Sequence, residues 1–361
     1  MKVLHVLRQF NHGGIECWLE RLLLAWPRDR RPEFHFALEE PDFGVLAPRM
    51  LSLGAHLHHC PPPRQTARAA SSLLSVLADH GPFQAIHCHN HHASVFNLAL
   101  AAQLGVPIRA SHSHADLRNS TASHSRFRRY YAGAARLAVR AVANVRLAVS
   151  KGAAADLFGE TGYPVEFLPC GIDFQPYVAP GGHRDPSRFT LIHVGRLVPE
   201  KNHSFLFRVL KGLTQTEPNA QLWLVGDGPL RPVLEAEAAA CGISDRVHFW
   251  GARNDIADLL SSADVFVFPS FSEGLGLAAI EAQAAGLPVV LASHLPTEID
   301  VFPTRCIRLA LDLPIEQWVI SILNSRDLAP LALTQRLARL EQSEFSIHSN
   351  VRSLSEVYAN K

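Results

Sequence analysis

The sequence lacks long apolar runs, paired cysteines and net charge. No apolar stretch in its 361 residues reaches the ~18 that would cross a membrane as a helix, and the first seven residues are too short and polar for a signal peptide. The six cysteines form no Cys-x-x-Cys pair, so we expect reduced thiols in a cytosolic protein. The 34 basic and 33 acidic residues nearly cancel, which argues against a nucleic-acid-binding surface.

A chain of this length has room for two domains. Short β-branched runs alternate with helical patterns throughout, which is typical of βαβ units and parallel sheets. Proline and glycine cluster over residues 176–188, and the alternation then restarts. We therefore predict an α/β protein of two doubly wound, Rossmann-like domains that face each other across a cleft. The expected domains are 1–175 and 187–345, with a last helix over 346–361 that packs back on the first domain.

The expected elements locate the loops where ligands would bind. In the first half, strands are predicted at 3–7, 35–38, 85–89, 107–111 and 146–150, with helices at 15–26, 72–77, 94–104 and 126–145. In the second half, strands are predicted at 189–194, 221–225, 247–250, 265–268 and 288–292, with helices at 203–213, 229–241, 256–262 and 278–285. Such sheets bind ligands at the carboxyl ends of their strands, so the turns that follow the strands are candidate sites.

Two glycine-bearing turns follow successive predicted strands of the second half. Gly195 and Arg196 end one strand, and Lys201 lies five residues further on. Two cations at one such junction can converge on a diphosphate, to which each charged hydrogen bond contributes roughly 1.5–3 kcal/mol. The second turn contains Gly226 and Gly228, which let the backbone approach a ligand closely.

A third turn leads into a helix and is flanked by two carboxylates. Glu273 precedes it, and Glu281 lies about two turns further on. The turn consists of Gly274, Leu275, Gly276 and Leu277. Because a helix N-terminus exposes N–H groups and the positive end of a dipole, this turn is a candidate anion site. The two carboxylates can then address opposite ends of one ligand.

These motifs resemble those of the retaining GT-B glycosyltransferases of family 4, and the resemblance covers nearly the whole chain. The Gly-Gly-Ile-Glu turn that follows the first predicted strand is similar to that of the family's capsule and exopolysaccharide branch. The residues that carry the resemblance lie at 13–16, 171–173, 195–202, 226–229, 273 and 281.

The resemblance implies transfer of a sugar from a nucleotide diphosphate sugar, with UDP favoured, to a glycan or lipid-linked acceptor in surface polysaccharide synthesis. It implies that Arg196 and Lys201 neutralise the leaving diphosphate, that Glu281 binds the ribose and that Glu273 contacts the donor sugar. The backbone of residues 274–277 would help to hold the donor. Further donor contacts are expected at Gly13, Gly14, Gly226 and Gly228. Since no DxD motif occurs, we expect a metal-independent enzyme with no cofactor beyond the sugar nucleotide as co-substrate.

Most of the 20 histidines lie in the first half, where acceptor binding is expected. The resemblance implies a histidine beside the reacting sugar, for which His112 is our first candidate and His114 our second. His114 is also expected among the acceptor-binding residues. His87 and His89 end another predicted strand and are expected to contact acceptor hydroxyls or loop backbone. A metal-hydrolase centre is the alternative for this stretch, although the carboxylates usual in such centres are missing from it.

A basic, partly aromatic stretch extends from Arg118 to Arg146. Apolar residues interleave with its arginines, and an amphipathic helix of this kind can lie on anionic lipid. The alternative is an ordinary solvated helix face. We expect a cytoplasmic protein with peripheral contact to the inner face of the cytoplasmic membrane, and no nucleic-acid partner because no RNA- or DNA-binding motif is visible.

Three other functions stay open from the sequence: another GT-B-type enzyme such as a nucleotide-sugar epimerase or a phosphorylase, a non-catalytic nucleotide-sugar binder, and a metal hydrolase. The joint presence of two cations and two carboxylates in the predicted donor site favours the transferase, because a simple binder has no need of all four. Two domains that share one site also predict closure of the cleft on donor binding.

Overall fold

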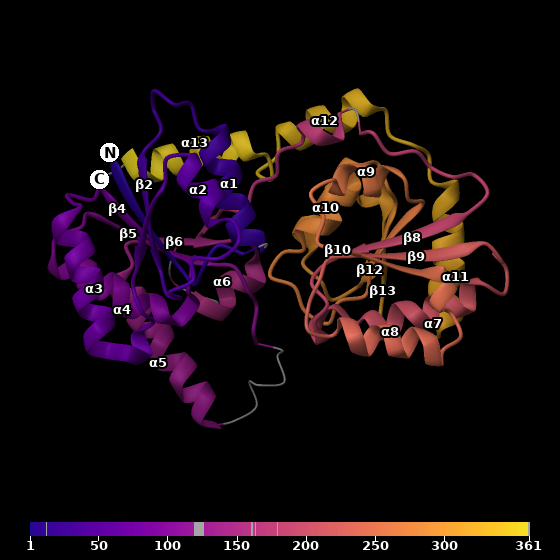
Figure 1. Ribbon diagram of the computed structural model, residues 1–361, viewed down its shortest axis with the longest axis horizontal. Helices are drawn as coiled ribbons and strands as arrows, with labels where there is room; N and C mark the ends of the chain where they lie inside the picture. The colour runs from indigo at the N-terminus through magenta and orange to yellow at the C-terminus, as the bar shows by residue number, and fades with distance from the viewer. Residues whose placement is uncertain (12, 119–125, 160–161, 163, 179, 360–361) are drawn as a thin grey trace. The chain divides into compact units, whose positions relative to one another are not determined.

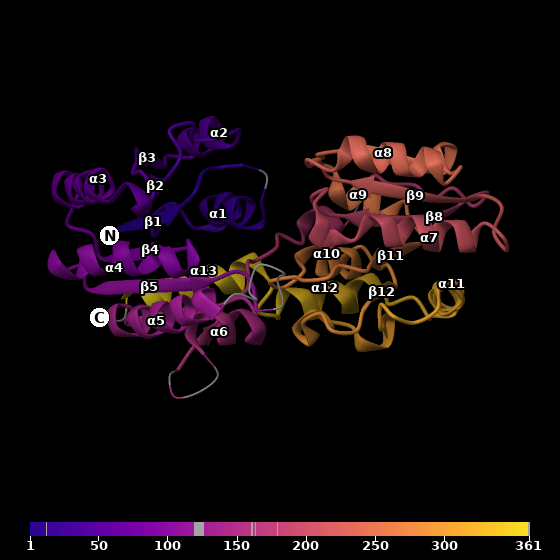
Figure 2. The ribbon, with the colours of Figure 1, turned by 90° about the horizontal axis from the view of Figure 1, so that it is seen from below.

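The computed structural model describes residues 1–11, 13–118, 126–159, 162, 164–178 and 180–359. The chain forms two compact units (Figures 1 and 2). The first unit consists of Met1–Asp173 together with Ser343–Lys361, and the second of Phe174–Gln342. Among the described residues, no helix has both the length and the apolar character needed to cross a membrane.

The first unit contains a parallel sheet of seven strands in the order β3-β2-β1-β4-β5-β6-β7. Its strands are β1 (Lys2–Leu7), β2 (Glu33–Leu38), β3 (His56–His59), β4 (Ala85–Cys88), β5 (Ile108–Ser113), β6 (Val145–Ala148) and β7 (Glu166–Phe167). Its helices are α1 (Gly14–Ala25), α2 (Ala47–Ser52), α3 (Thr66–Asp79), α4 (Ser94–Gln103), α5 (Arg126–Val142), α6 (Lys151–Phe158) and α13 (Ile347–Ala359).

The two faces of this sheet bury different residues. Leu4, Val6, Ile86 and Cys88 pack against apolar side chains of α3 to α6 in one core cluster. Because side chains alternate along a strand, the residues between them point to the opposite face, which α1 and α13 cover. Figure 1 shows α3, α4 and α5 on one side of the sheet and α1 and α13 on the other.

The last helix closes the first unit by returning to the segment that precedes the second unit. The Ile172 N–H donates to the carbonyl of Phe345 at 2.7 Å, and the Ile347 N–H donates to the carbonyl of Ile172 at 3.0 Å. A Cβ at Gly171 would lie 2.7 Å from Oδ1 of Asn350, so only glycine lets α13 approach this closely.

The second unit repeats the architecture with six parallel strands in the order β10-β9-β8-β11-β12-β13. Its strands are β8 (Phe189–Val194), β9 (Ala220–Val225), β10 (Val247–Gly251), β11 (Val265–Phe268), β12 (Val289–Ala292) and β13 (Cys306–Leu309). Its helices are α7 (His203–Leu213), α8 (Arg231–Ala240), α9 (Ile256–Ser261), α10 (Leu277–Ala284), α11 (Ile315–Asn324) and α12 (Leu333–Glu341). Side chains of α7, α8 and α11 share one core cluster, while Figure 1 shows α9 and α10 on the other face.

The predicted fold class, two doubly wound parallel sheets, is confirmed. The sequence prediction missed the strands β3, β7 and β13 and the short helices α2 and α6. All three missed strands lie at sheet edges and are partly buried or exposed, so none has the apolar alternation that identifies a half-buried strand. In β3, three of the four residues are histidines.

Strand order indicates where each sheet would bind a ligand. A doubly wound sheet binds its ligand where neighbouring strands send their connections in opposite directions, outside the carboxyl ends. In the first unit this point lies between β1 and β4, and in the second it lies between β8 and β11. The predicted turn at Gly13 follows β1, His89 follows β4, and the predicted donor residues follow β8 and β11.

Candidate active site

The loops after β8 and β11 are joined by three polar contacts. Nζ of Lys201 donates to Oε1 of Glu273 at 2.6 Å, in an ion pair whose side chains are 19% and 9% exposed. Nδ2 of Asn202 donates to the carbonyl of Pro269 at 3.1 Å, and the Phe271 N–H donates to the carbonyl of Glu200 at 2.8 Å. The first and third predicted turns, which are the most distant of the three in sequence, therefore lie together between β8 and β11, at the point where the strand order of this sheet reverses (the switch point).

The loops after β8 and β9 pack backbone against backbone. The Gly195 N–H donates to the carbonyl of Val225, and the Leu197 N–H donates to the carbonyl of Asp227. A Cβ at Gly226 would lie 2.1 Å from the carbonyl oxygen of Gly195, and one at Gly228 would lie 2.5 Å from that of Leu197. These glycines therefore serve loop packing, and their predicted donor contacts stay predictions.

Gly226→Ala is expected to destabilise the second unit by about 3 kcal/mol or more, because it combines a backbone clash with a φ of +130°. In calorimetry this corresponds to a fall in Tm of roughly 6–12 °C. Gly242→Ala is the matched control, since Gly242 has a φ of +70° and nothing within 4 Å of its added Cβ. Equal shifts for the two variants would contradict the packing argument.

The third predicted turn leads into α10. Gly276 is the N-cap residue and has a φ of +103°, which favours glycine. Leu277 begins the helix, and Glu281 lies in its second turn, half-buried. As at any helix start, the first amides of α10 lack the usual i−4 partners, although the Ala279 N–H donates to the carbonyl of Gly276 at 3.0 Å. The side chain of Arg196 is exposed after β8.

Five histidines gather on one face of the first unit's sheet. His5 lies on β1, His87 on β4 with His89 directly after it, and His112 on β5 with His114 after it. The spacing of two residues within each pair puts all these rings on the same face. Trp18 of α1 packs edge-on against His112, with ring centroids 5.4 Å apart at 88°.

One continuous chain of hydrogen bonds joins these rings. Nε2 of His112 lies 2.8 Å from the carbonyl of Leu168, and its Nδ1 lies 3.2 Å from Nε2 of His87. Nδ1 of His87 lies 2.7 Å from the hydroxyl of Tyr358 on α13, which in turn lies 3.5 Å from Nε2 of His5.

From His5 the chain of hydrogen bonds continues outward to His114. Nδ1 of His5 lies 2.9 Å from Nε2 of His89, and Nδ1 of His89 lies 2.9 Å from Nε2 of His114. Nδ1 of His114 lies 3.5 Å from Sγ of Cys170. Burial lowers the pKa of His5 to about 3, and it raises the pKa of the Cys170 thiol. These side chains are therefore neutral at pH 7.

The carbonyl of Leu168 sets the direction of every bond in this chain, because it can only accept. His112 then carries its proton on Nε2, which leaves Nδ1 to accept from His87. Nδ1 of His87 then accepts from the hydroxyl of Tyr358, whose oxygen accepts from Nε2 of His5. In the same way Nδ1 of His5 accepts from Nε2 of His89, and Nδ1 of His89 accepts from Nε2 of His114. Each ring is therefore protonated on Nε2. The hydrogen-bond pattern thus fixes one tautomer for all five histidines.

This arrangement distinguishes the two candidates for the sugar-adjacent histidine. His112 is fully buried, and both of its ring nitrogens have protein partners. His114 also has a partner at each ring nitrogen, His89 and Cys170, but it lies beyond the end of β5 and is partly exposed. The structure therefore gives His114 the better access to a ligand. His87 and His89 are buried as well, so the predicted acceptor contacts through their rings would require the side chains to move.

Two groups of three histidines in this cluster have nitrogens within 4.8 Å of one another: His5 with His87 and His89, and His89 with His112 and His114. A metal ion there would have to replace hydrogen bonds between neutral rings. The sequence predicted no carboxylate beside this stretch, yet the fold brings two to its end. Oε1 of Glu39 accepts from Asn90 at 2.8 Å, and Asp156 lies 3.3 Å from His91. Both carboxylates therefore already have partners within the protein.

Known proteins resemble this chain along its whole length. Residues 13–175 match the family model described as Glycosyltransferase Family 4, and residues 181–302 match Glycosyl transferases group 1. The putative glycosyltransferase EpsF of Bacillus subtilis is 31% identical over 375 residues, which cover 99% of this chain and 96% of the relative. The chain belongs to glycosyltransferase family 4.

Two further comparisons are narrower: one relative matches only part of this glycosyltransferase, and one solved structure shares its fold. An Escherichia coli UDP-Gal:alpha-D-GlcNAc-diphosphoundecaprenol alpha-1,3-galactosyltransferase is 32% identical over 141 residues, 36% of each chain. Among solved structures, Anabaena HepE in complex with UDP aligns over 100% of both chains with a TM-score of 0.78 at 19% identity. The second similarity identifies the glycosyltransferase fold as GT-B.

Sequence reasoning missed the residues that organise the histidine cluster. Trp18 donates from Nε1 to Oδ1 of Asn350 at 2.7 Å, and Tyr358 joins His87 to His5. Both partners come from α13, more than 250 residues away in sequence, so no local pattern links them to the histidines. His5 could have been found, because it faces the same side of the predicted sheet as His87.

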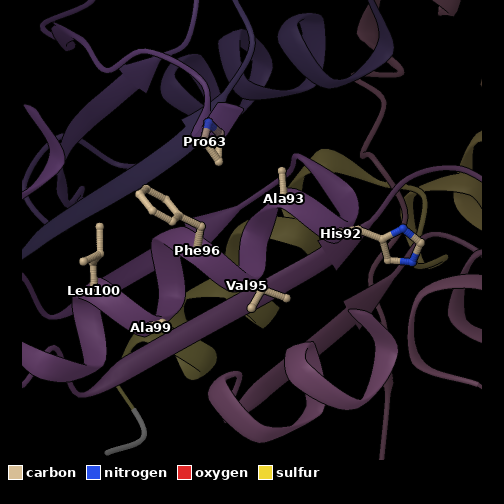
Figure 3. A pocket seen from close by; sticks show the side chains of 7 residues that line it. All are labelled: Pro63, His92, Ala93, Val95, Phe96, Ala99 and Leu100. Carbon is tan, nitrogen blue, oxygen red and sulfur yellow. The ribbon is translucent and has the colours of Figure 1, made fainter. Parts of the chain in front are cut away.

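The glycosyltransferase also has an apolar hollow beside α4 (Figure 3). It is lined by Pro63, His92, Ala93, Val95, Phe96, Ala99 and Leu100. None of the predicted site residues lines it. It therefore adds nothing to the donor or acceptor assignments.

Proposed function

We propose that this glycosyltransferase moves a sugar, with retention of anomeric configuration, from a nucleotide diphosphate sugar to a glycan or lipid-linked acceptor in surface polysaccharide synthesis. The observation that carries the proposal is the meeting of Lys201 and Glu273 at the β8–β11 switch point, beside the start of α10. The names of EpsF, the E. coli galactosyltransferase and the UDP-bound HepE support it.

The chemistry asks for positive charge where the diphosphate leaves. When the bond between the anomeric carbon and the diphosphate breaks, negative charge accumulates on the phosphate oxygens. Lys201, the exposed Arg196 and the first amides of α10 would stabilise that charge, because they are donors already in place. Glu281 would accept from the ribose hydroxyls and Glu273 from the donor sugar.

The ion pair of Lys201 implies an exchange of partners when the donor binds. A diphosphate that reaches Nζ of Lys201 competes with the carboxylate of Glu273 for the same ammonium group. Of the histidines, His114 is proposed beside the sugar, with the hydrogen-bond chain through His89 holding its ring.

Glu273→Gln is expected to tighten the binding of UDP about tenfold while it lowers the rate of sugar transfer. The substitution removes the competing negative charge, and charges a few ångströms apart near a protein surface interact by roughly 1–4 kcal/mol. Isothermal titration with UDP measures the first effect, and donor hydrolysis measures the second. Weaker UDP binding by Glu273→Gln would show that the carboxylate instead holds Lys201 in its binding position.

The nucleotide of the donor and the stereochemistry of the transfer can be tested in one set of experiments. Thermal-shift screening with UDP, GDP and ADP sugars is expected to single out UDP sugars, since a ligand at 100 times its Kd stabilises by about 2.7 kcal/mol. GDP is a necessary comparison, because a GDP-mannose-dependent mannosyltransferase of Mycobacterium tuberculosis is 39% identical over 30% of this chain. NMR of the product then reads the anomeric configuration, and an inverted product would refute retention.

We propose further that the reaction needs no bound metal ion. Arg196 and Lys201 supply cations at the place where metal-dependent transferases use an ion, so transfer is expected to keep its rate in EDTA. Loss of activity in EDTA that Mg²⁺ or Mn²⁺ restores would refute this. Transfer of the sugar to an acceptor also separates a transferase from an epimerase, a phosphorylase and a non-catalytic binder.

Peripheral membrane contact through residues 118–146 also stays a proposal. On α5, Tyr130 and Leu137 lie two turns apart and are 80% and 65% exposed, which supports an apolar contact surface. Among the arginines of the stretch, Arg136 donates to the carbonyl of Asp156 and Arg140 to that of Phe158, so part of its charge serves the fold. Residues 119–125 and the side chains of 126–129 and 131 lie outside the described part of the stretch.

A further inference from the structure

A second cluster of histidines lies at the edge of the first unit's sheet, away from the carboxyl ends of its strands. His35 is on β2, His58 is on the edge strand β3, and His80 directly follows α3. The carbonyl of His80 accepts from Lys2 at the beginning of β1, which places this cluster toward the amino ends of the strands. The candidate active site lies at the opposite ends.

The three rings are close enough to share one ion. One nitrogen of each ring lies within 4.8 Å of one nitrogen of both others. The ring centroids of His58 and His80 are 4.5 Å apart, and those of His35 and His58 are 5.2 Å apart with parallel planes. Tetrahedral Zn²⁺ with bonds of about 2.0–2.1 Å holds its nitrogen ligands roughly 3.4 Å apart, so small shifts would suffice.

The hydrogen bonds already orient His35 as a metal ligand would be oriented. Its Nε2 lies 2.9 Å from Oε1 of Glu33, and an ionised carboxylate only accepts, so Nε2 carries the proton. Nδ1 of His35 therefore accepts from Nε2 of His58, 2.9 Å away. An ion would replace this hydrogen bond, and His58 would then carry its proton on Nδ1 so that Nε2 is free to bind the ion. A carboxylate that fixes the tautomer of a histidine from behind is the usual outer partner in zinc sites.

The surroundings suit a neutral ligand set that water can reach. His35 is buried with the Phe83 ring perpendicular to it, whereas His58 is half-buried and His80 is exposed. Burial, then the neighbouring histidines, lower the pKa of His58 to about 4, so its ring is unprotonated at pH 7. Lys2 lies 3.8 Å from Glu33 and balances that carboxylate.

We propose that His35, His58 and His80 form a binding site for a divalent first-row transition ion such as Zn²⁺, with Glu33 as the outer partner of His35. Imidazole is a preferred ligand of Zn²⁺, Ni²⁺ and Cu²⁺. The ion would join the edge strand β3 to β2 and to the end of α3, and so stabilise an edge that is otherwise only partly buried. This site is independent of the proposed transferase reaction.

The test is isothermal titration of the tag-free, full-length chain with ZnCl₂ at pH 7.5. His59→Gln is the matched control, because His59 is the exposed neighbour of His58 on the same strand. The wild type and His59→Gln are expected to bind one Zn²⁺ at this site with equal affinity, and His58→Gln to bind at least 100-fold more weakly. Zn²⁺ should also raise the Tm of the first two proteins and leave that of His58→Gln unchanged.

Glu33→Gln provides a second variant at an exposed position, where folding is not at risk. Loss of the outer carboxylate is expected to weaken Zn²⁺ binding about 10–100-fold. Absence of Zn²⁺ binding by the wild type would overturn the proposal. So would equal Zn²⁺ affinity in the wild type, His58→Gln and Glu33→Gln, since the ion would then bind elsewhere.

Discussion

Lowering the pH from 7.5 to 5.5 is expected to destabilise the first unit by about 5 kcal/mol while it affects the second unit much less. Burial holds the pKa of His5 and His112 at about 3 and that of His87 and His89 well below the ordinary value of 6.5. The unfolded chain therefore binds more protons than the folded one below pH 6.5, and stability falls as the pH falls.

The size of the effect follows from proton counting. Each fully buried neutral histidine costs about 1.4 kcal/mol for every pH unit below its unfolded pKa, and four of them lie in this cluster. The sum is comparable with the total stability of a typical domain, roughly 5–15 kcal/mol. Burial also lowers the pKa of His58 and His92 to about 4 and that of His114 well below its ordinary value, so the sum over four histidines is a lower bound for the first unit. In the second unit, burial lowers the pKa of only His193 and His203 among the described histidines.

Calorimetry between pH 5.5 and 7.5 measures this loss, and hydrogen exchange assigns it to peptides of β1, β4 and β5. We expect the transition of the first unit to fall by roughly 10–20 °C. His59→Gln removes an exposed histidine and should leave the pH profile unchanged, whereas His87→Gln should lower the proton uptake on unfolding by about one. A flat profile over this range would mean that the histidines are charged in the folded state.

Alanine at Lys201 or at Arg196 is expected to slow sugar transfer by about 10²–10³-fold each. Both groups would act on charge that develops only as the diphosphate leaves, so kcat should fall more than the KM for the donor rises. Lys201→Ala also leaves the largely buried Glu273 carboxylate without its partner, so the Tm of this variant must be measured beside its rate.

Lys211→Ala is the matched control for this experiment. Lys211 is exposed on the last turn of α7, the helix that begins two residues after Lys201. Its removal changes the net charge of the unit equally but should leave transfer unaffected. Wild-type rates in both Lys201→Ala and Arg196→Ala would exclude these residues from the reaction.

The sequence was sufficient to predict the elements that build the donor side. β8, α7 and β11 begin and end where their apolar periodicity predicted. Gly195 and Gly226 marked the turns, because close backbone packing leaves a local signature in residue type. The ion pair of Lys201 with Glu273 was not predicted, and it follows from the adjacency of β8 and β11 that the structure shows.

The histidine side could not be predicted in the same way. His112 was the first candidate for the histidine beside the sugar, yet it is fully buried under α1 and α13, and α13 returns from the far end of the chain. The edge cluster of His35, His58 and His80 depends on β3, a strand without an apolar pattern. Both clusters depend on packing between segments that are distant in sequence, and the periodicity of a single segment carries no information about such packing.

A crystal structure of the protein with UDP, grown in EDTA, tests the central claim most directly. We expect a diphosphate oxygen within about 3.2 Å of Nζ of Lys201, the Arg196 guanidinium on the same diphosphate and no ion between them. UDP bound away from these two side chains, or a structure that forms only with a divalent cation bridging the phosphates, would contradict the account.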